Sequence, residues 1–255
     1  MAELLAGQTI WPWALAGLLL GAIFGSFLAT LVIRWPEGRS VLSGRSSCDG
    51  CGRVLGLVDL LPLAGYALRK GRCATCGARI DFRHPAIEIA CAGIGAISLS
   101  VGPGIEGLLG AAFGWLLVAL AALDVEHFWL PNPLVALLAL MGLAGGIAEV
   151  GVDLPARLFG GLAGFLSLAI IALSYRLLRG KTGMGGGDPK LLGAIGLTLG
   201  WQALPLVILG GALTGFLLLG LRHFRGAAVR RNQEVPFGAL MALVAWPLWL
   251  VAPLG

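Results

Sequence analysis

Charged side chains are scarce in this sequence. Only 12% of its 255 residues are Asp, Glu, Lys or Arg, whereas an ordinary soluble domain carries roughly 25%. Hydrophobic residues make up 58% of the chain, and its mean hydropathy is +0.90. This composition excludes a soluble globular domain and indicates a polytopic membrane protein. The first residues also lack a basic segment and a small-residue cleavage site, so we expect the first apolar run to remain as an anchor.

Histidine is scarce as well, with three residues in the chain. The sequence contains no His-Glu-x-x-His motif, which disfavours a zinc protease of that type, and no Ser-His-Asp arrangement is visible. The hydrophilic segment 34–85 lacks the interleaved basic and aromatic residues expected of a nucleic-acid-binding surface. These absences exclude nucleic acid as a partner and leave the few acidic residues as the candidates for chemistry.

Apolar runs of a length suited to membrane crossing recur along the whole chain. A transmembrane helix needs about 20 mostly apolar residues, with roughly 17 tolerated. We expect an all-α protein with about eight such helices, of which the sixth is the shortest. The expected spans are 10–33, 86–102, 107–124, 133–149, 157–178, 189–201, 204–221 and 236–253.

The basic residues predict the orientation of these spans. All but one of the 18 Lys and Arg residues fall in segments 34–85, 176–190 and 222–231, and Arg157 is the exception. With eight spans these segments share one side, which the positive-inside rule makes cytoplasmic, with both termini outside. The segment 124–132 falls on the same side but carries two acids and a histidine instead of basic residues.

Two aspartates stand at the cytoplasmic ends of apolar runs. Asp188 follows three glycines, and Asp124 ends the run 107–124. Ionisable residues at a membrane boundary are costly and are therefore functional candidates. Simpler interpretations exist for both: Asp188 could be the N-cap of a helix that begins at Pro189, and Asp124 could be a solvated boundary carboxylate. Asn132 looks like the cap of the fourth span.

A pair of carboxylates in unlike surroundings suits acid–base hydrolysis. One stays ionised and deprotonates a water molecule, and the other stays protonated and polarises a carbonyl or protonates a leaving amine. We assign Asp188 as the base, although a close pair titrates as a unit. Gly185, Gly187 and Lys190 are expected to support the site. Glu126 and His127 are expected to face water, and Glu88 to pair with an arginine of the preceding loop.

Four cysteines form two C-x-x-C pairs in segment 34–85. Cys48 and Cys51 are followed by Gly52, and Cys73 and Cys76 by Gly77, which suits tight turns that present two sulfurs each to one metal ion. Four thiolates at this spacing favour structural Zn²⁺, which would supply the folding energy of a loop with little apolar content. Disulfides or a redox C-x-x-C are the alternatives. Cys91 is expected to be a packing residue.

At these residues the sequence resembles the type IV prepilin peptidases, the bacterial aspartic leader peptidases of type IV pilus and type II secretion systems. The resemblance covers nearly the whole chain, and its motifs occur in order. They are Gly25-Ser-Phe-Leu28, the four-cysteine loop with Asp59-Leu-Leu-Pro62, Arg72-Cys73, His84-Pro-Ala-Ile-Glu88, Leu123-Asp-Val-Glu-His127, Leu130-Pro-Asn132, Gly183-Met-Gly-Gly-Gly-Asp-Pro-Lys190 and Val235-Pro-Phe-Gly238.

The resemblance implies cleavage of the short basic leader of prepilins or pseudopilins, with Asp124 and Asp188 as the catalytic pair. It also implies, in many members, methylation of the new N-terminal amine with S-adenosylmethionine by the N-terminal region; no residue that would bind this cofactor is identified. Expected partners are prepilins or pseudopilins, the lipid bilayer, and the pilus or type II secretion machinery. The expected location is the bacterial inner membrane, with the active site facing the cytoplasm and both termini periplasmic.

The expected organisation is a first transmembrane helix (1–33), a cytoplasmic zinc-binding loop (34–85) and a transmembrane aspartic peptidase domain (86–255). Three alternatives stay open. The acids could serve a membrane transporter or proton relay, although no clear internal repeat is present. The zinc loop could make the protein a binding platform for an assembly ATPase. The chain could also be a peptidase without methyltransferase activity, because Ala29 and Trp35 stand where the family pattern has other residues.

Overall fold

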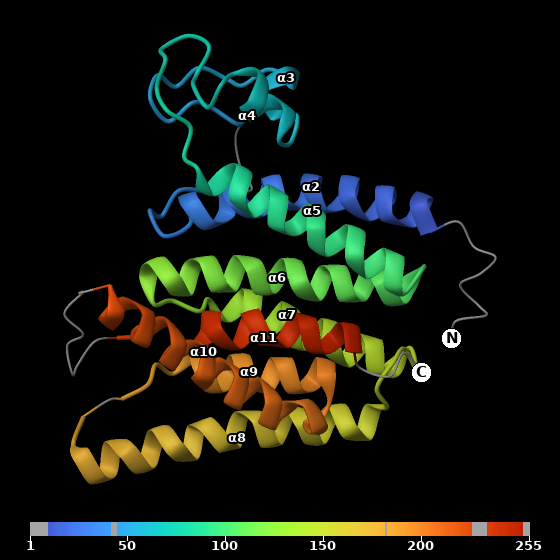
Figure 1. Ribbon diagram of the computed structural model, residues 1–255, viewed down its shortest axis with the longest axis vertical. Coiled ribbons are helices and arrows are strands. Elements are labelled where there is room, and N and C mark those ends of the chain that lie inside the picture. Colours follow the sequence, from blue (N-terminus) through green and yellow to red (C-terminus); the bar gives the residue numbers. More distant parts are fainter. Residues whose placement is uncertain (1–9, 42–44, 182, 226–233, 252–255) are drawn as a thin grey trace. The chain divides into compact units, whose positions relative to one another are not determined.

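A computed structural model describes residues 10–41, 45–181, 183–225 and 234–251, and within these ranges the chain is almost entirely helical (Figure 1). Each of the eight apolar runs coincides with one helix. These helices are α2 (Ile10–Arg34), α5 (Arg83–Val101), α6 (Ile105–His127), α7 (Asn132–Ile147), α8 (Leu154–Arg179), α9 (Gly187–Leu199), α10 (Leu204–Phe224) and α11 (Phe237–Val251). Two short helices, α3 (Leu57–Leu60) and α4 (Ala64–Leu68), lie in the cysteine loop, and a 3-10 turn, η1 (Trp201–Ala203), precedes α10.

Within the described residues, five helical segments are long and apolar enough to cross a membrane, which fits a multi-pass membrane protein. They are Ile10–Arg34, Arg83–Val101, Ile105–His127, Leu154–Arg179 and Trp201–Phe224. The remaining three are shorter: α7 has 16 residues, α11 has 15 and α9 has 13. At ~1.5 Å per residue, α9 measures about 20 Å, less than the ~30 Å hydrocarbon core. The expectation of eight helices is confirmed, whereas eight full crossings stay a prediction.

The chain separates into two compact units, Met1–Ala119 and Leu120–Gly255. The three-part division expected from the sequence stays a prediction, and its terminal segments 1–9 and 252–255 lie outside the described residues.

In the first unit, α2 and α5 pack so closely that a Cβ at Gly17 or Gly21 would overlap backbone carbonyls of Gly95 or Cys91. The Trp115 indole donates to the Cys91 carbonyl oxygen at 2.8 Å. Cys91 is fully buried, as expected for a packing residue.

The second unit is built around α9. This helix contacts α7, α8, α10 and α11, and ten of its residues are buried. A short helix that is buried on nearly all sides does not need to match the bilayer thickness, because neighbouring helices cover both of its ends. The chain therefore places Asp188, at the start of α9, inside a helical bundle rather than in an open loop.

Arg157 is buried among helices, whereas the charge count treats it as a boundary charge on the side opposite the other basic residues. It lies in the first turn of α8, is 6% exposed, and donates to five backbone carbonyl oxygens, those of Gly142, Val150, Val152, Leu197 and Thr198. These carbonyls belong to the C-terminal parts of α7 and α9 and to the segment before α8, where helix ends leave acceptors unsatisfied. Arg157 is therefore an internal clamp rather than a loop charge.

Candidate active site

Asp124 lies in the last turn of α6, within the second unit, and is buried with 5% of its surface exposed. Its Oδ2 accepts a hydrogen bond of 2.8 Å from the Ala239 N–H in the first turn of α11. The interpretation of Asp124 as a solvated boundary carboxylate is therefore wrong. The helix continues past the end of the apolar run to His127, and the buried carboxylate is satisfied by a backbone donor instead of water.

Asp188 also lies inside a helix. Gly186 is the N-cap of α9, so Asp188 is the second residue of the helix and is 8% exposed. The expectation that Asp188 itself caps the helix is wrong, because Gly186 already has the helical conformation (φ −68°, ψ −6°) that brings the glycine segment into the first turn. A carboxylate in the first turn still benefits from the positive end of the helix dipole.

The structure brings the two aspartates together from different helices. Their carboxylates interact electrostatically with each other, and the Gly238 backbone at the start of α11 interacts with both. A Cβ at Gly238 would lie 2.9 Å from Asp124 Oδ2. Only glycine leaves room there for the backbone to approach both carboxylates. The arrangement is a buried carboxylate pair held by the backbone donors of a third helix.

The sequence assigned no role to the residues that complete this pair. Gly238 and Ala239 act through backbone N–H groups, which no side-chain pattern indicates. Leu130 is a second omission: its side chain lies against both Gly187 and Gly238, 2.8 and 2.9 Å from the positions that a Cβ would occupy there. The available signal was the family resemblance, whose motifs Leu130-Pro-Asn132 and Val235-Pro-Phe-Gly238 include Leu130 and Gly238 without giving them a role.

The predicted supporting residues lie around Asp188. Lys190 Nζ donates a 2.9 Å hydrogen bond to Asn132 Oδ1 and so joins the starts of α9 and α7. The expectation that Asn132 caps α7 is wrong, because Pro131 is the cap and the Asn132 side chain binds Lys190. Gly185 borders Asp188, whose Oδ2 would lie 3.9 Å from a Cβ at that position.

The other acidic candidates lie elsewhere. Glu126 and His127 are exposed at the end of α6, with 3.7 Å between Glu126 Oε2 and His127 Nε2, as expected for residues that face water. Glu88, in the first unit, is 6% exposed and accepts a 2.7 Å hydrogen bond from the Leu63 N–H. Its carboxylate binds the loop backbone, and the expected pairing of Glu88 with an arginine stays a prediction.

The four cysteines form two matching knuckles in the first unit. The first is closed by an isolated bridge between Ser47 and Val54, and the second by a bridge between Arg72 and Arg79. In each knuckle the glycine after the second cysteine has a positive φ, +69° at Gly52 and +70° at Gly77. The expectation of tight glycine turns is confirmed.

The four sulfurs converge on one point. All lie within 4.8 Å of one another, and Cys48 Sγ is 3.8 Å from Cys76 Sγ. A disulfide needs about 2.05 Å, and all four cysteines are free. Four ligands at ~2.3 Å from a tetrahedral Zn²⁺ would lie about 3.8 Å apart. The backbone N–H groups of Cys76 and Thr75 lower the pKa of the Cys73 thiol to about 6. The Ala78 N–H lowers the pKa of Cys76, but the neighbouring thiols and burial raise it to about 11, so Cys73 gives a thiolate more readily than Cys76.

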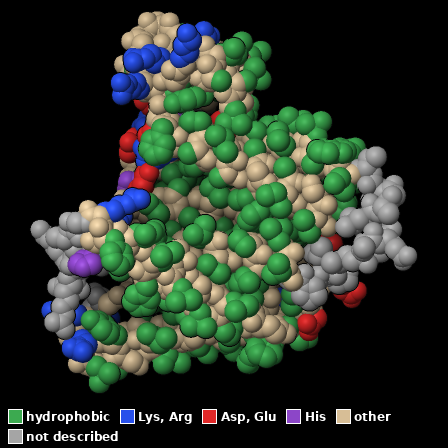
Figure 2. Space-filling model, in the orientation of Figure 1, with side chains coloured by type: hydrophobic (Ala, Val, Ile, Leu, Met, Phe, Trp, Pro, Cys, Tyr) green, Lys and Arg blue, Asp and Glu red, His purple; other side chains and the backbone are tan. Residues whose placement is uncertain are grey.

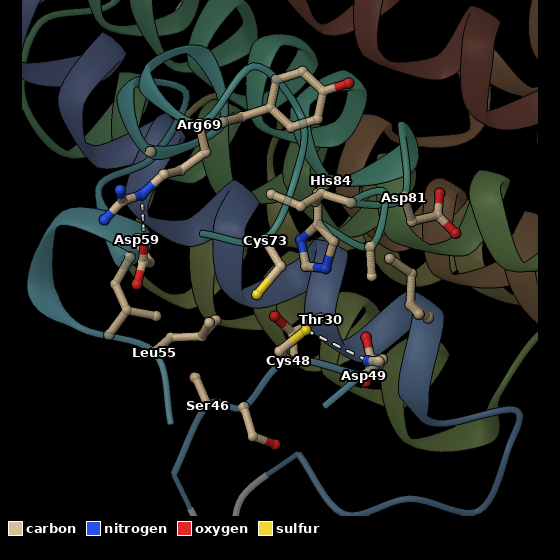
Figure 3. Close-up of a pocket in the computed structure, with 18 of the residues that line it drawn as sticks. Thr30, Ser46, Cys48, Asp49, Leu55, Asp59, Arg69, Cys73, Asp81 and His84 are labelled. Carbon is tan, nitrogen blue, oxygen red and sulfur yellow. Dashed lines mark hydrogen bonds and ion pairs between the residues drawn. The ribbon is translucent and has the colours of Figure 1, made fainter. Parts of the chain in front are cut away.

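A cavity of about 460 Å³ lies between the cysteine knuckles and the adjoining ends of α2 and α5 (Figure 3). Its walls carry charges of both signs, and Figure 3 shows Asp59, Asp49, Asp81 and His84 around it, with Arg69 directed at Asp59. The Arg53 Nε at its edge is buried and lacks a hydrogen-bond partner among the described residues. The cavity has the size of a small-molecule site.

Taken together, the apolar helices, the buried carboxylate pair and the four-sulfur cluster define a multi-pass membrane protein with an acidic site and a candidate metal site. Two family models match: the bacterial peptidase A24 N-terminal domain over residues 19–101 and the type IV leader peptidase family over residues 111–220. The chain belongs to the type IV leader peptidase family and is a peptidase. No solved structure matches the chain.

Several relatives are similar over almost their full length, and each is named a prepilin leader peptidase/N-methyltransferase. The Dickeya chrysanthemi protein is 37% identical, with 94% of both chains covered. The Aeromonas hydrophila protein is 33% identical, with 92% of this chain and 90% of the relative covered. The Pseudomonas aeruginosa protein is 32% identical over 92% of this chain and 89% of the relative.

Proposed function

We propose that this protein is an aspartic endopeptidase that removes the basic leader of type IV prepilins or pseudopilins, with Asp124 and Asp188 as its catalytic pair. The observation that carries the proposal is the meeting of two buried carboxylates from α6 and α9 at the Gly238 backbone. Two nearby carboxylates cannot both ionise freely, so the pair retains a proton. One member then activates water while the other protonates the leaving amine.

The glycine loop supports access of a substrate to this pair. A Cβ at Gly186 would meet nothing within 4 Å, and one at Gly185 would meet only the Asp188 carboxylate at 3.9 Å. Space therefore remains beside Asp188, where an extended peptide could lie. Gly187, in contrast, is pressed against Leu130. Gly185 and Gly186 would admit the substrate, whereas Gly187 and Lys190 would fix the start of α9.

The basic residues support a site at the cytoplasmic membrane face. In the second unit the C-terminal ends of α8 and α10, with Arg176, Arg179 and Arg222, lie at the same end as the starts of α9 and α11 (Figure 1). The positive-inside rule makes that end cytoplasmic, which matches a basic leader that stays in the cytoplasm. With the eight crossings of the bacterial inner membrane that the apolar runs predict, the same rule predicts periplasmic termini, which lie outside the described residues.

The direct test is cleavage of a prepilin reconstituted with the protein in lipid vesicles. Asp124→Asn and Asp188→Asn remove the acid–base function at nearly constant shape, and each is expected to lower the rate by roughly 10²- to 10⁴-fold. Glu149→Gln, an exposed acid in the connection after α7, is the matched control and should cleave at the normal rate. Normal cleavage by either aspartate variant would refute the proposed pair.

The cysteine knuckles are proposed to hold a structural Zn²⁺. Besides the sulfur spacing, Arg53 supports the fit: its Nε is buried without a partner in the described part of the chain, and its guanidinium interacts with Cys73. A metal-bound thiolate is an acceptor for such a donor, in the manner of the outer hydrogen bonds that orient metal ligands. Bound Zn²⁺ would supply cross-linking and folding energy, and Cys48, Cys51, Cys73 and Cys76 would hold it.

The cavity beside the knuckles favours a second activity, transfer of a methyl group from S-adenosylmethionine to the new N-terminal amine. Bound, that cofactor supplies an activated methyl group. Its amino-acid end is zwitterionic, and the cavity wall offers the Arg34 guanidinium for a carboxylate. The Asp49 carboxylate, which also pairs with Arg39 at 2.6 Å, could bind the ammonium group. The volume and the mixed charge fit such a molecule, and the names of the relatives agree.

Binding of S-adenosylmethionine can be measured apart from activity by equilibrium dialysis with the full-length protein in vesicles. We expect Asp49→Asn to weaken binding at least tenfold while leader cleavage continues, and Glu149→Gln to change neither. Absence of binding to the unaltered protein would make it a peptidase without methyltransferase activity and would leave the carboxylate pair unaffected.

Two other functions make predictions that differ from those of the peptidase. A transporter or proton relay built on the same acids would carry ions across vesicle membranes, and loss of that flux in Asp124→Asn without loss of cleavage would support it. A binding platform for pilus or type II secretion assembly would keep its function in both aspartate variants and lose it with Cys48→Ser. Docking to that machinery is compatible with the peptidase and stays a prediction.

A further inference from the structure

The segment that joins the two cysteine knuckles exposes its apolar side chains and buries its charged one, which is the opposite of a surface that faces water. Residues 57–68 form α3, α4 and the turn between them, and Asp59 is the only charged residue among them. Asp59 points inward, with 9% of its side chain exposed, whereas Leu57 is 86% and Leu68 is 67% exposed. Val58, Leu60 and Leu61 are also exposed. We call these five apolar residues the α3–α4 apolar face.

Asp59 is held inward by strong partners. Arg53 and Arg69 bind its two carboxylate oxygens at 2.7 and 2.8 Å, and the Gly56 N–H donates at 3.2 Å. The Gly56 N–H and these two guanidiniums lower the pKa of Asp59, so the carboxylate is charged at neutral pH. A charged group turned inward beneath exposed leucines is the arrangement found where the outside is hydrocarbon rather than water.

We propose that the α3–α4 apolar face inserts into the acyl region of the membrane. It enters the leaflet that lies on the same side of the membrane as the cysteine knuckles. The partner is thus the lipid bilayer itself. The inference concerns residues 57–68 of the first unit and does not depend on the proposed peptidase activity.

The depth of the segment supports this placement. The Glu88 carboxylate accepts the Leu63 N–H at the start of α4, and Glu88 is five residues beyond the first residue of α5. At ~1.5 Å per residue, this anchor lies about 7.5 Å along a helix that is apolar enough to span a membrane. Interfacial elements bury their apolar side about 5–10 Å into the boundary between head groups and acyl chains. Figure 1 shows α3 and α4 alongside the length of α2 and α5 rather than beyond their ends.

The distribution of side chains agrees with a lipid partner. Figure 2 shows hydrophobic side chains gathered on one side of the knuckle region and Lys and Arg on the other. Lys70 and Arg72 follow the apolar face in the sequence, and basic residues beside an interfacial apolar face bind anionic head groups. Phe82 and Ile89, near the start of α5, are exposed apolar residues as well, and α5 is itself a candidate span.

Site-specific photo-crosslinking of the full-length protein tests the placement. p-Benzoylphenylalanine replaces Leu57 or Leu68, the protein is reconstituted in vesicles of phosphatidylethanolamine and phosphatidylglycerol, and adducts are identified by mass spectrometry. The matched control carries the probe at Arg79, an exposed position of the second knuckle. We expect lipid acyl-chain adducts at positions 57 and 68 in at least tenfold excess over position 79.

Other outcomes contradict the proposal. Adducts to a second copy of the chain or to an added prepilin would make the apolar face a protein-docking surface. Equal and low lipid labelling at all three positions would mean that the face points into water. In a second experiment, Leu57→Ser combined with Leu68→Ser should reduce lipid labelling by a probe at Leu61 at least fivefold, and unchanged labelling there would also overturn the insertion.

Discussion

At the scale of single residues, the candidate site depends on backbone groups as much as on its two acids. Asp124 and Asp188 could be singled out from the sequence because carboxylates are rare beside apolar runs. The donors at Gly238 and Ala239 could not, because a backbone N–H belongs to every residue except proline and its direction is set by the fold. Leu130 begins one of the motifs of the family resemblance, but its contact with Gly187 and Gly238 could not be predicted from the sequence.

Gly238→Ala tests this dependence without touching either aspartate. The new methyl group would lie 2.9 Å from Asp124 Oδ2 and 2.9 Å from Leu130 Cδ1, so we expect the carboxylate to shift and cleavage to fall at least tenfold. The measurement is the cleavage rate in vesicles. Gly220→Ala in α10 is the matched control, because a Cβ there meets nothing within 4 Å, and it should cleave normally. Equal activity of the two variants would contradict the assigned role of Gly238.

At the scale of helices, apolar run length predicted the elements well and their ends poorly. All eight expected helices are present, because burying a backbone in hydrocarbon leaves few alternatives to a helix. The ends differ by several residues where polar or glycine residues continue a helix. Examples are α6, which runs on to His127, and α9, which already begins at Gly187. Arg157 shows the same limit: its contacts with two helix ends depend on tertiary packing that a charge count does not register.

Gly21→Ala tests the packing of α2 on α5. A Cβ at Gly21 would overlap the Cys91 backbone, which cannot move aside as a side chain would, so we expect a loss of roughly 1–3 kcal/mol, the usual cost of overpacking. Thermal unfolding in detergent, followed by circular dichroism, gives the measurement. Gly93→Ala lies on α5 with nothing within 4 Å and should unfold like the unaltered protein. An unchanged melting temperature for Gly21→Ala would contradict the close approach.

At the scale of the whole molecule, two compact units carry the two clusters of polar residues. The first holds the cysteine knuckles and the charged cavity, and the second holds the carboxylate pair. The cysteine spacing predicted the metal-binding geometry because two knuckles are local structures closed by their own turns. The cavity was not predicted, since it is lined by residues from α2, from both knuckles and from the start of α5.

Removal of the proposed Zn²⁺ should unfold the knuckle region alone. The contacts of the knuckle region are mainly polar and local, whereas the apolar helices pack independently of the metal. We therefore expect a strong chelator to accelerate trypsin cleavage within residues 45–82 at least tenfold. The helical content of the protein should stay constant. Cys48→Ser should be cleaved rapidly with or without the chelator, and Cys91→Ser should behave like the unaltered protein. Trypsin cleavage that does not respond to the chelator would contradict a structural metal.

The most direct test of the central claim is a comparison of Asp124→Asn, Asp188→Asn and the double variant in the same vesicle cleavage assay. If the two carboxylates act as one unit, each single change removes nearly the whole catalytic effect, and the double variant is no slower than the slower single variant within about threefold. Losses that multiply in the double variant would mean that the aspartates act separately, and normal cleavage by either single variant would show that the pair is not the catalytic site.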